Sequence, residues 1–123
     1  MDVMIEITKK VPPHSILATP SGRSEFELQH IDSEKVIIET KKGSSITIPA
    51  SCFQGAFSFL RTADWVEIGA SHGTAKSHSF DSFLREHTSG VSVASYVAPI
   101  LEKASIVEIN RRRPAEIRLK KQS

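Results

Sequence analysis

Three short segments between residues 25 and 49 constrain the fold of this chain most strongly, because each has the composition and periodicity of a β-strand. Glu25–Ile31 alternates apolar and polar side chains, and Val36–Thr40 is rich in β-branched residues, which favour strands. Ser45–Pro49 alternates in the same way, and its proline ends the pattern. Asp32–Lys35 and Lys41–Ser44 have the small and polar residues of tight turns. The sequence therefore predicts an antiparallel β-meander.

The segments on either side of the meander are predicted to complete the same unit. Met1–Lys10 alternates weakly in polarity, which we interpret as a short edge strand, and Ile16 and Leu17 as another. Ser51–Arg61 has apolar residues spaced as on one face of a helix, with its first residue as a candidate N-cap. Such a helix would cover the apolar face of the sheet. Trp65–Ile68 predicts one more strand.

The C-terminal third is predicted to contain two helices followed by a β-ribbon. Phe80–His87 has the pattern of a short helix, and a second helix begins at Ser92 with an apolar stripe. Pro99 lies inside this second helix, where we expect it to produce a kink or to mark the junction of two helices. Ile106–Ile109 and Ala115–Leu119 have the pattern of strands joined by an arginine-rich turn.

These patterns predict an α+β protein of two small lobes. The first lobe, residues 1–69, is the meander covered by one helix. Residues 70–78 are polar and rich in small side chains, and we interpret them as a linker or exposed loop. The second lobe, residues 79–123, contains the two helices and the ribbon.

Charge is distributed unevenly along the chain, although the net charge is only +2. Six of the 16 basic residues, but one of the 14 acidic residues, lie after Asn110. This asymmetry indicates a C-terminal region that faces a polyanion. The alternative interpretation is a solvated C-terminal tail.

A helix, a short turn, a second helix and a ribbon with a basic tip, over about Phe80 to Lys121, resemble the second half of a winged-helix DNA-binding domain. The resemblance implies that the second helix faces the DNA groove and that the ribbon turn is the wing. The second helix has one lysine and no arginine, so we expect phosphate contacts rather than base reading. The implied DNA-binding residues are Ser92, Ser95, Tyr96, Lys103, Arg111, Arg112, Arg113, Arg118, Lys120 and Lys121. The alternative is a lobe of this shape used for packing or dimerisation.

A second motif, Glu39-Thr40-Lys41, resembles half of the core of the PD-(D/E)xK nucleases. The resemblance implies that an upstream acid and Glu39 hold Mg²⁺, and that Lys41 positions or activates water. Asp32 is the available upstream acid, but it lies in a predicted turn rather than on a separate strand. A magnesium-dependent nuclease is therefore the weaker of the functional hypotheses.

Histidines provide the third candidate. Two of His72, His78 and His87, together with Asp81, have ligand types that zinc accepts. Surface histidines in a polar loop are the simpler interpretation, so we expect no metal and no cofactor.

The rest of the sequence narrows the class of protein. No run of about 18 apolar residues is present, and the N-terminus has no secretory pattern, so we expect neither a membrane partner nor export. The single cysteine, Cys52, fits a reducing cytoplasm and is expected to be a small buried side chain. We therefore predict a cytoplasmic, non-enzymatic protein that binds double-stranded DNA. The alternative is an accessory module whose sheet or apolar helix docks a protein partner.

Overall fold

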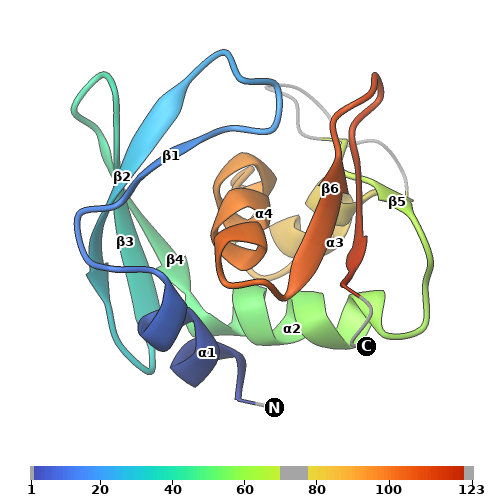
Figure 1. Ribbon diagram of the computed structural model, residues 1–123, viewed down its shortest axis with the longest axis horizontal. Coiled ribbons are helices and arrows are strands. Elements are labelled where there is room, and N and C mark those ends of the chain that lie inside the picture. The colour runs from blue at the N-terminus through green and yellow to red at the C-terminus, as the bar shows by residue number, and fades with distance from the viewer. Residues whose placement is uncertain (1, 70–77, 121–123) are drawn as a thin grey trace.

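The computed structural model describes residues 2–69 and 78–120, and these residues form an α+β fold. A four-stranded sheet lies on one side of the molecule and a three-stranded sheet on the other (Figure 1). Helix α4 (Ala94–Lys103) lies between the two sheets, and α2 (Ala50–Leu60) runs beneath both. No helix among the described residues is long and apolar enough to cross a membrane.

The first sheet confirms the predicted meander. Its strands β1 (Ile16–Ala18), β2 (Glu25–Ile31), β3 (Lys35–Thr40) and β4 (Ser45–Pro49) are antiparallel and neighbours in chain order. The alternation seen in the sequence separates the two faces, because the buried residues Phe26, Leu28, Val36, Ile38 and Ile48 share one of them. This apolar face is directed toward the helices.

The predicted N-terminal edge strand is wrong, since these residues form helix α1 (Val3–Lys10). Asp2 caps the helix, and its side chain accepts hydrogen bonds from the backbone N–H groups of Met4 and Ile5. Val3, Met4 and Ile7 are buried at helical spacing, whereas Ile5 is 51% exposed. The strand-like spacing of Val3, Ile5 and Ile7 in the sequence is therefore misleading, because these three side chains are not buried on one common face.

The amphipathic helix predicted at Ser51–Arg61 is confirmed as α2, but it starts one residue earlier than predicted. The helix begins at Ala50 after Pro49, and no side chain caps it, so the prediction of Ser51 as the N-cap is wrong. A proline is compatible with this position because its missing N–H needs no partner there. The strand predicted after the helix is the short β5 (Val66–Glu67).

The C-terminal part contains α3 (Phe80–Arg85), α4, β6 (Val107–Asn110) and β7 (Glu116–Leu119). The helix predicted from Ser92 begins at Ala94 and continues through Pro99 as one element. The ribbon is confirmed, and β5 adds a third strand to it in the order β5-β7-β6. The predicted linker lies outside the described residues except for His78.

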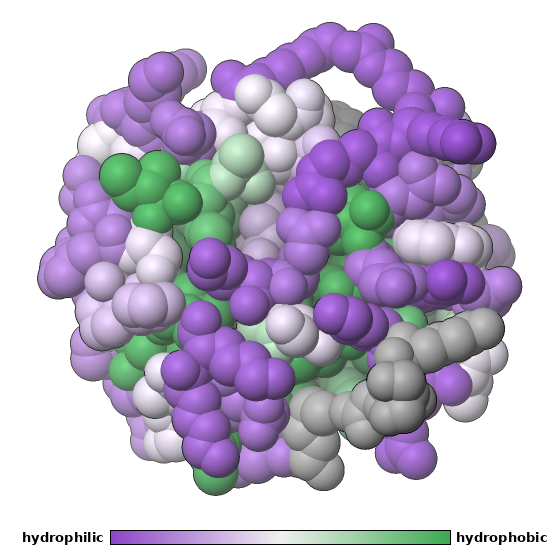
Figure 2. All heavy atoms as spheres, in the orientation of Figure 1, coloured by the Kyte–Doolittle hydropathy of each residue, from purple (hydrophilic) through white to green (hydrophobic). Residues whose placement is uncertain are grey.

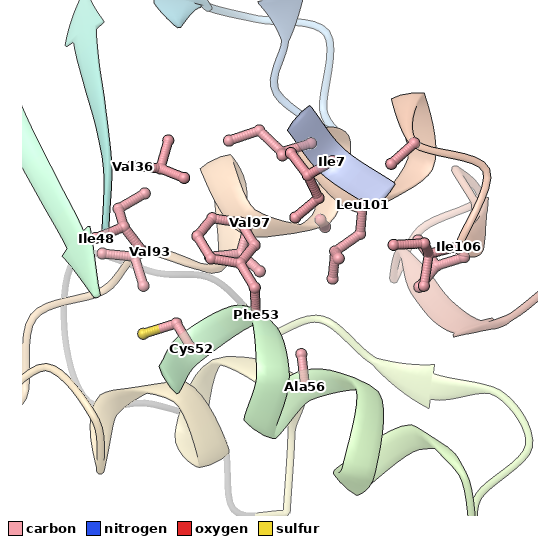
Figure 3. Close-up of a cluster of buried hydrophobic side chains, with 14 of the residues drawn as sticks. Ile7, Val36, Ile48, Cys52, Phe53, Ala56, Val93, Val97, Leu101 and Ile106 are labelled. Carbon is pink, nitrogen blue, oxygen red and sulfur yellow. The ribbon is translucent and has the colours of Figure 1, made fainter. Parts of the chain in front are cut away.

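A single buried cluster holds these elements together. Figure 3 shows side chains from α1, the first sheet, α2 and α4 converging on one another, with Phe53 of α2 near the centre. Burying one large apolar side chain contributes roughly 1.5–3 kcal/mol. Because residues from both predicted lobes belong to this cluster, the lobes are packed directly against each other.

Candidate nucleic-acid interface

The tip of the β6–β7 ribbon carries three consecutive arginines beyond the last paired residues. The ladder ends at the pair Asn110 and Glu116, and the side-chain oxygen of Asn110 accepts a hydrogen bond from the backbone N–H of Arg112 (3.1 Å). The side chains of Arg112 and Arg113 are exposed, and neither makes an ion pair with any residue that the structure describes. The ribbon therefore presents two uncompensated guanidinium groups to solvent.

Arg111, the first arginine of the tip, is held by Glu102 of α4. Its two terminal nitrogens donate to the two carboxylate oxygens at 2.7 and 2.6 Å. These hydrogen bonds raise the pKa of the Arg111 guanidinium above its usual range. The pair fixes the base of the tip against the C-terminal end of α4 and compensates one of the three charges.

Arg118 lies further along the ribbon and is also engaged. Its Nε donates to Glu108 (2.9 Å), and a terminal nitrogen donates to Asp64 (3.3 Å). The hydrogen bond to Glu108 is the main reason that the pKa of Arg118 is raised. The guanidinium carbon also lies 4.3 Å from the centre of the Trp65 ring. Arg118 thus links the ribbon to the segment that precedes β5.

Ser92, predicted to face DNA, makes a hydrogen bond inside the protein. Its hydroxyl donates to Asp81 Oδ1 (2.7 Å). Asp81 is fully buried and also accepts a hydrogen bond from Arg85 Nε (2.9 Å). This cluster ties α3 to the turn that leads into α4.

Helix α4 has little free surface. Tyr96 packs edge-to-face on Phe26 of the first sheet, with ring centroids 5.2 Å apart. Ser95 is half-buried, and Lys103 is exposed at the C-terminal end. The buried residues of the helix are Ala94, Val97, Ala98, Pro99, Ile100 and Leu101.

A shallow depression of about 300 Å³ separates the end of β1 from the base of the ribbon tip. Leu17 and Ala18 line it on the side of the sheet, and Pro99 lines it from α4. Lys103 and Arg111 contribute cationic groups to the same depression. The predicted contacts at this end are therefore grouped, although Glu102 lies among them.

The last two predicted contacts follow β7. Lys120 is exposed, and its backbone N–H donates to the carbonyl of Ile106, which holds its position beside the ribbon. No residue that the structure describes forms an ion pair with its side chain. Lys121 lies outside the described residues.

The residues of the nuclease hypothesis do not converge. Asp32 precedes β3 and Glu39 lies near its other end, so the length of a strand separates the two carboxyl groups. Asp32 instead accepts hydrogen bonds from the N–H groups of Glu34 and Lys35 and from His30. These bonds, that of His30 first, lower its pKa to about 2.

The histidines are also dispersed. His72 lies outside the described residues, His78 is exposed, and His87 packs against the ring of Phe83 at 5.1 Å. Asp81, the expected acidic ligand, is paired with Arg85. Across residues 2–69 and 78–120, no group of three or more histidine, cysteine or acidic side chains is placed to hold a metal ion.

The acidic partners of Arg111 and Arg118 were missed by sequence reasoning. Glu102 lies nine residues before Arg111 on a different element, and Asp64 lies 54 residues before Arg118. No local spacing rule connects such pairs, because tertiary packing brings them together. Comparison with protein-family models, with curated proteins and with solved structures finds no match for this chain.

Proposed function

We propose that this protein binds double-stranded DNA through the tip of the β6–β7 ribbon, with Arg112 and Arg113 as the main phosphate contacts. The observation that carries the proposal is the exposure of these two arginines without an acidic partner in the described chain. Guanidinium groups suit phosphate oxygens because they are always charged and donate in a fixed fork. Lys120 and Lys103 add exposed positive charge on the same ribbon and at its base.

The arrangement of the C-terminal elements supports a winged-helix-like unit as the carrier of this tip. Among the described residues, helices α2, α3 and α4 lie between the first sheet and the ribbon in chain order, and β5 pairs with β7 to complete a small sheet. The resemblance stated for the last third of the sequence therefore extends back to α2. In this proposal the ribbon is the wing.

The packing of α4 favours backbone contact over base reading. Tyr96 packs on Phe26, and the apolar stripe of α4 is buried in the core. The hydroxyl of Ser92 donates a hydrogen bond to Asp81. Arginine, asparagine and glutamine, which read base edges, do not occur in the helix. We therefore expect affinity that depends strongly on salt and weakly on DNA sequence.

The experiment compares two variants that remove the same charge. The double variant Arg112→Ala/Arg113→Ala removes the proposed phosphate-binding side chains, and Lys9→Ala/Lys10→Ala removes two cations from α1, at the opposite end of the molecule (Figure 1). Binding of two unrelated duplexes is measured by fluorescence anisotropy between about 50 and 200 mM salt. The arginine variant should flatten the plot of log affinity against log salt by about 0.9 for each phosphate no longer neutralised, or about 1.8 in all, equally for both duplexes. No binding by the wild-type protein, or the same slope in all three proteins, would overturn the proposal.

A second candidate function is the docking of a protein partner on the first sheet. Strand β1 is at the edge of the sheet, and its Ile16 is 65% exposed. Figure 2 shows hydrophobic side chains at the surface over this strand. Exposed edge strands can pair with a strand of another chain. Co-purification of a protein partner that Ile16→Lys abolishes, without DNA binding, would favour this function over the first.

A further inference from the structure

The turns of the first sheet place more positive charge at the end of the molecule where the ribbon tip lies. In an antiparallel meander the first and third connections emerge from the same end of the sheet, and these are the β1–β2 and β3–β4 turns. They carry Arg23, Lys41 and Lys42 and no acidic residue. Figure 1 shows both turns at the same end as the tip of the β6–β7 ribbon.

The first sheet and the ribbon meet at this end. Ala18, the last residue of β1, lines the same depression as Arg111, the first residue of the ribbon tip. In Figure 2, hydrophilic side chains project over the β3–β4 turn and over the ribbon tip. The turns and the tip therefore belong to one surface.

The two turns hold their cations in fixed backbone frames. Thr19 N–H donates to the Ser24 carbonyl (2.9 Å) across the first turn, and Thr40 N–H donates to the Ser44 carbonyl (2.8 Å) across the second. Gly43 has φ +87°, a conformation that a residue with a side chain adopts rarely, and this closes the second turn behind Lys42. The cationic side chains themselves are exposed and make no ion pair within the described part of the chain.

The other surfaces of the sheet have different charge. Glu25, Glu27 and Glu39 alternate with buried residues and so lie on the outer face, away from α4. The β2–β3 turn at the opposite end carries Asp32 and Glu34. A polyanion is therefore repelled from the outer face and from the β2–β3 turn, and attracted to the basic turns at the other end of the sheet.

We propose that Arg23, Lys41 and Lys42 join Arg112 and Arg113 in one phosphate-binding surface, which we call the basic rim. This inference rests on the proposed function and adds the first sheet as a second contact with the DNA backbone. The two turns are two strand spacings apart, about 10 Å. The Debye length at about 0.1 M salt is also about 10 Å, so the fields of neighbouring cations reinforce one another over this distance. Duplex DNA offers one charge per roughly 1.7 Å of its axis, which is dense enough to meet every cation of the rim.

The test uses a third double variant, Lys41→Ala/Lys42→Ala, alongside the two described above. Each of the three proteins therefore lacks two positive charges of the wild-type protein. Thermal melting checks that each variant is folded, which is expected because all six side chains are exposed. Binding of one duplex is measured across the same salt series. Lys41→Ala/Lys42→Ala should flatten the salt dependence by about 1.8, as Arg112→Ala/Arg113→Ala does, while Lys9→Ala/Lys10→Ala should not.

The outcomes separate the two proposals. A flattened slope for the arginine variant alone would overturn the inference and leave the proposed function standing. If the arginine variant and Lys41→Ala/Lys42→Ala both show the same slope as Lys9→Ala/Lys10→Ala, the inference and the proposed function are both overturned. A further decrease in slope of about 0.9 when Arg23→Ala is combined with Lys41→Ala/Lys42→Ala would support a contact from the β1–β2 turn as well.

Discussion

Glu102 is the residue whose neutralisation tests the electrostatic argument most directly. Its carboxylate occupies both terminal nitrogens of Arg111 at the base of the ribbon tip. It also adds a negative charge to the depression lined by Lys103. Glu102→Gln keeps the shape of the side chain and removes the charge, so Arg111 becomes available for a phosphate.

The magnitude follows from counterion release. One additional phosphate contact steepens the plot of log affinity against log salt by about 0.9. Between about 1 M and about 0.1 M salt, the affinity of the variant should therefore rise about 8-fold more than that of the wild-type protein. The cost in stability is small, because the side chains of Arg111 and Glu102 are 47% and 33% exposed. Exposed ion pairs contribute about 0–1 kcal/mol. We therefore expect tighter DNA binding with little change in the unfolding transition.

The assay is a salt-titrated anisotropy measurement, with Glu34→Gln as the matched control. Glu34 lies in the β2–β3 turn at the far end of the sheet, so its neutralisation changes the net charge equally without freeing an arginine. Equal affinity and equal slope for the two variants would refute the assignment of Arg111 to the interface.

Three further predictions concern the part of the fold that supports the candidate interface. Asp81→Ala removes the buried carboxylate that accepts hydrogen bonds from Ser92 and Arg85 and should destabilise the fold by about 1–3 kcal/mol in urea unfolding, so an unchanged free energy of unfolding would contradict the role of this anchor. Asp32 has its pKa lowered from 3.8 to about 2 by His30 and two backbone N–H groups, so its stabilising effect is present above about pH 4 and disappears as the pH falls toward 2. The difference in melting temperature between the wild-type protein and Asp32→Ala should therefore shrink over that range. A constant difference would argue against a stabilising role of the Asp32 carboxylate. Burial raises the pKa of the Cys52 thiol to about 11, so an aromatic disulfide reagent at about pH 8 should label it only after unfolding, whereas rapid labelling of the native protein would show that the site opens.

The parts of the fold that the sequence predicted correctly are those in which local pattern and burial coincide. Strands β2 and β4 alternate because one face of the sheet is buried, and α2 shows helical spacing because one side of the helix is buried in the core. The segment of α1 has both patterns at once, since Val3 and Ile7 are compatible with either period. There the capping of the helix by Asp2, rather than hydrophobic periodicity, is the informative signal.

The candidate interface was harder to predict because its accessible charge depends on tertiary neighbours. The sequence shows Arg111, Arg112 and Arg113 as equivalent, but the position of Glu102 makes the first different from the other two. The alternating turns of the meander contained a usable signal for Lys41 and Lys42, because the first and third turns must share one end of the sheet. Their relation to the ribbon depends on how the two sheets pack around α4.

The position of α4 also bears on the mode of binding within the proposed function. For the helix to enter a groove, the first sheet would have to move away and separate Phe26 from Tyr96. Exposing one large aromatic side chain costs roughly 1.5–3 kcal/mol, and separating the edge-to-face pair adds about 0.5–1.5 kcal/mol. A good bidentate contact to a base contributes about 1–3 kcal/mol of discrimination, and α4 has no arginine, asparagine or glutamine to make one. Opening the protein would therefore cost free energy that no side chain of α4 can recover, and this supports our proposal of phosphate binding by the basic rim of the closed fold.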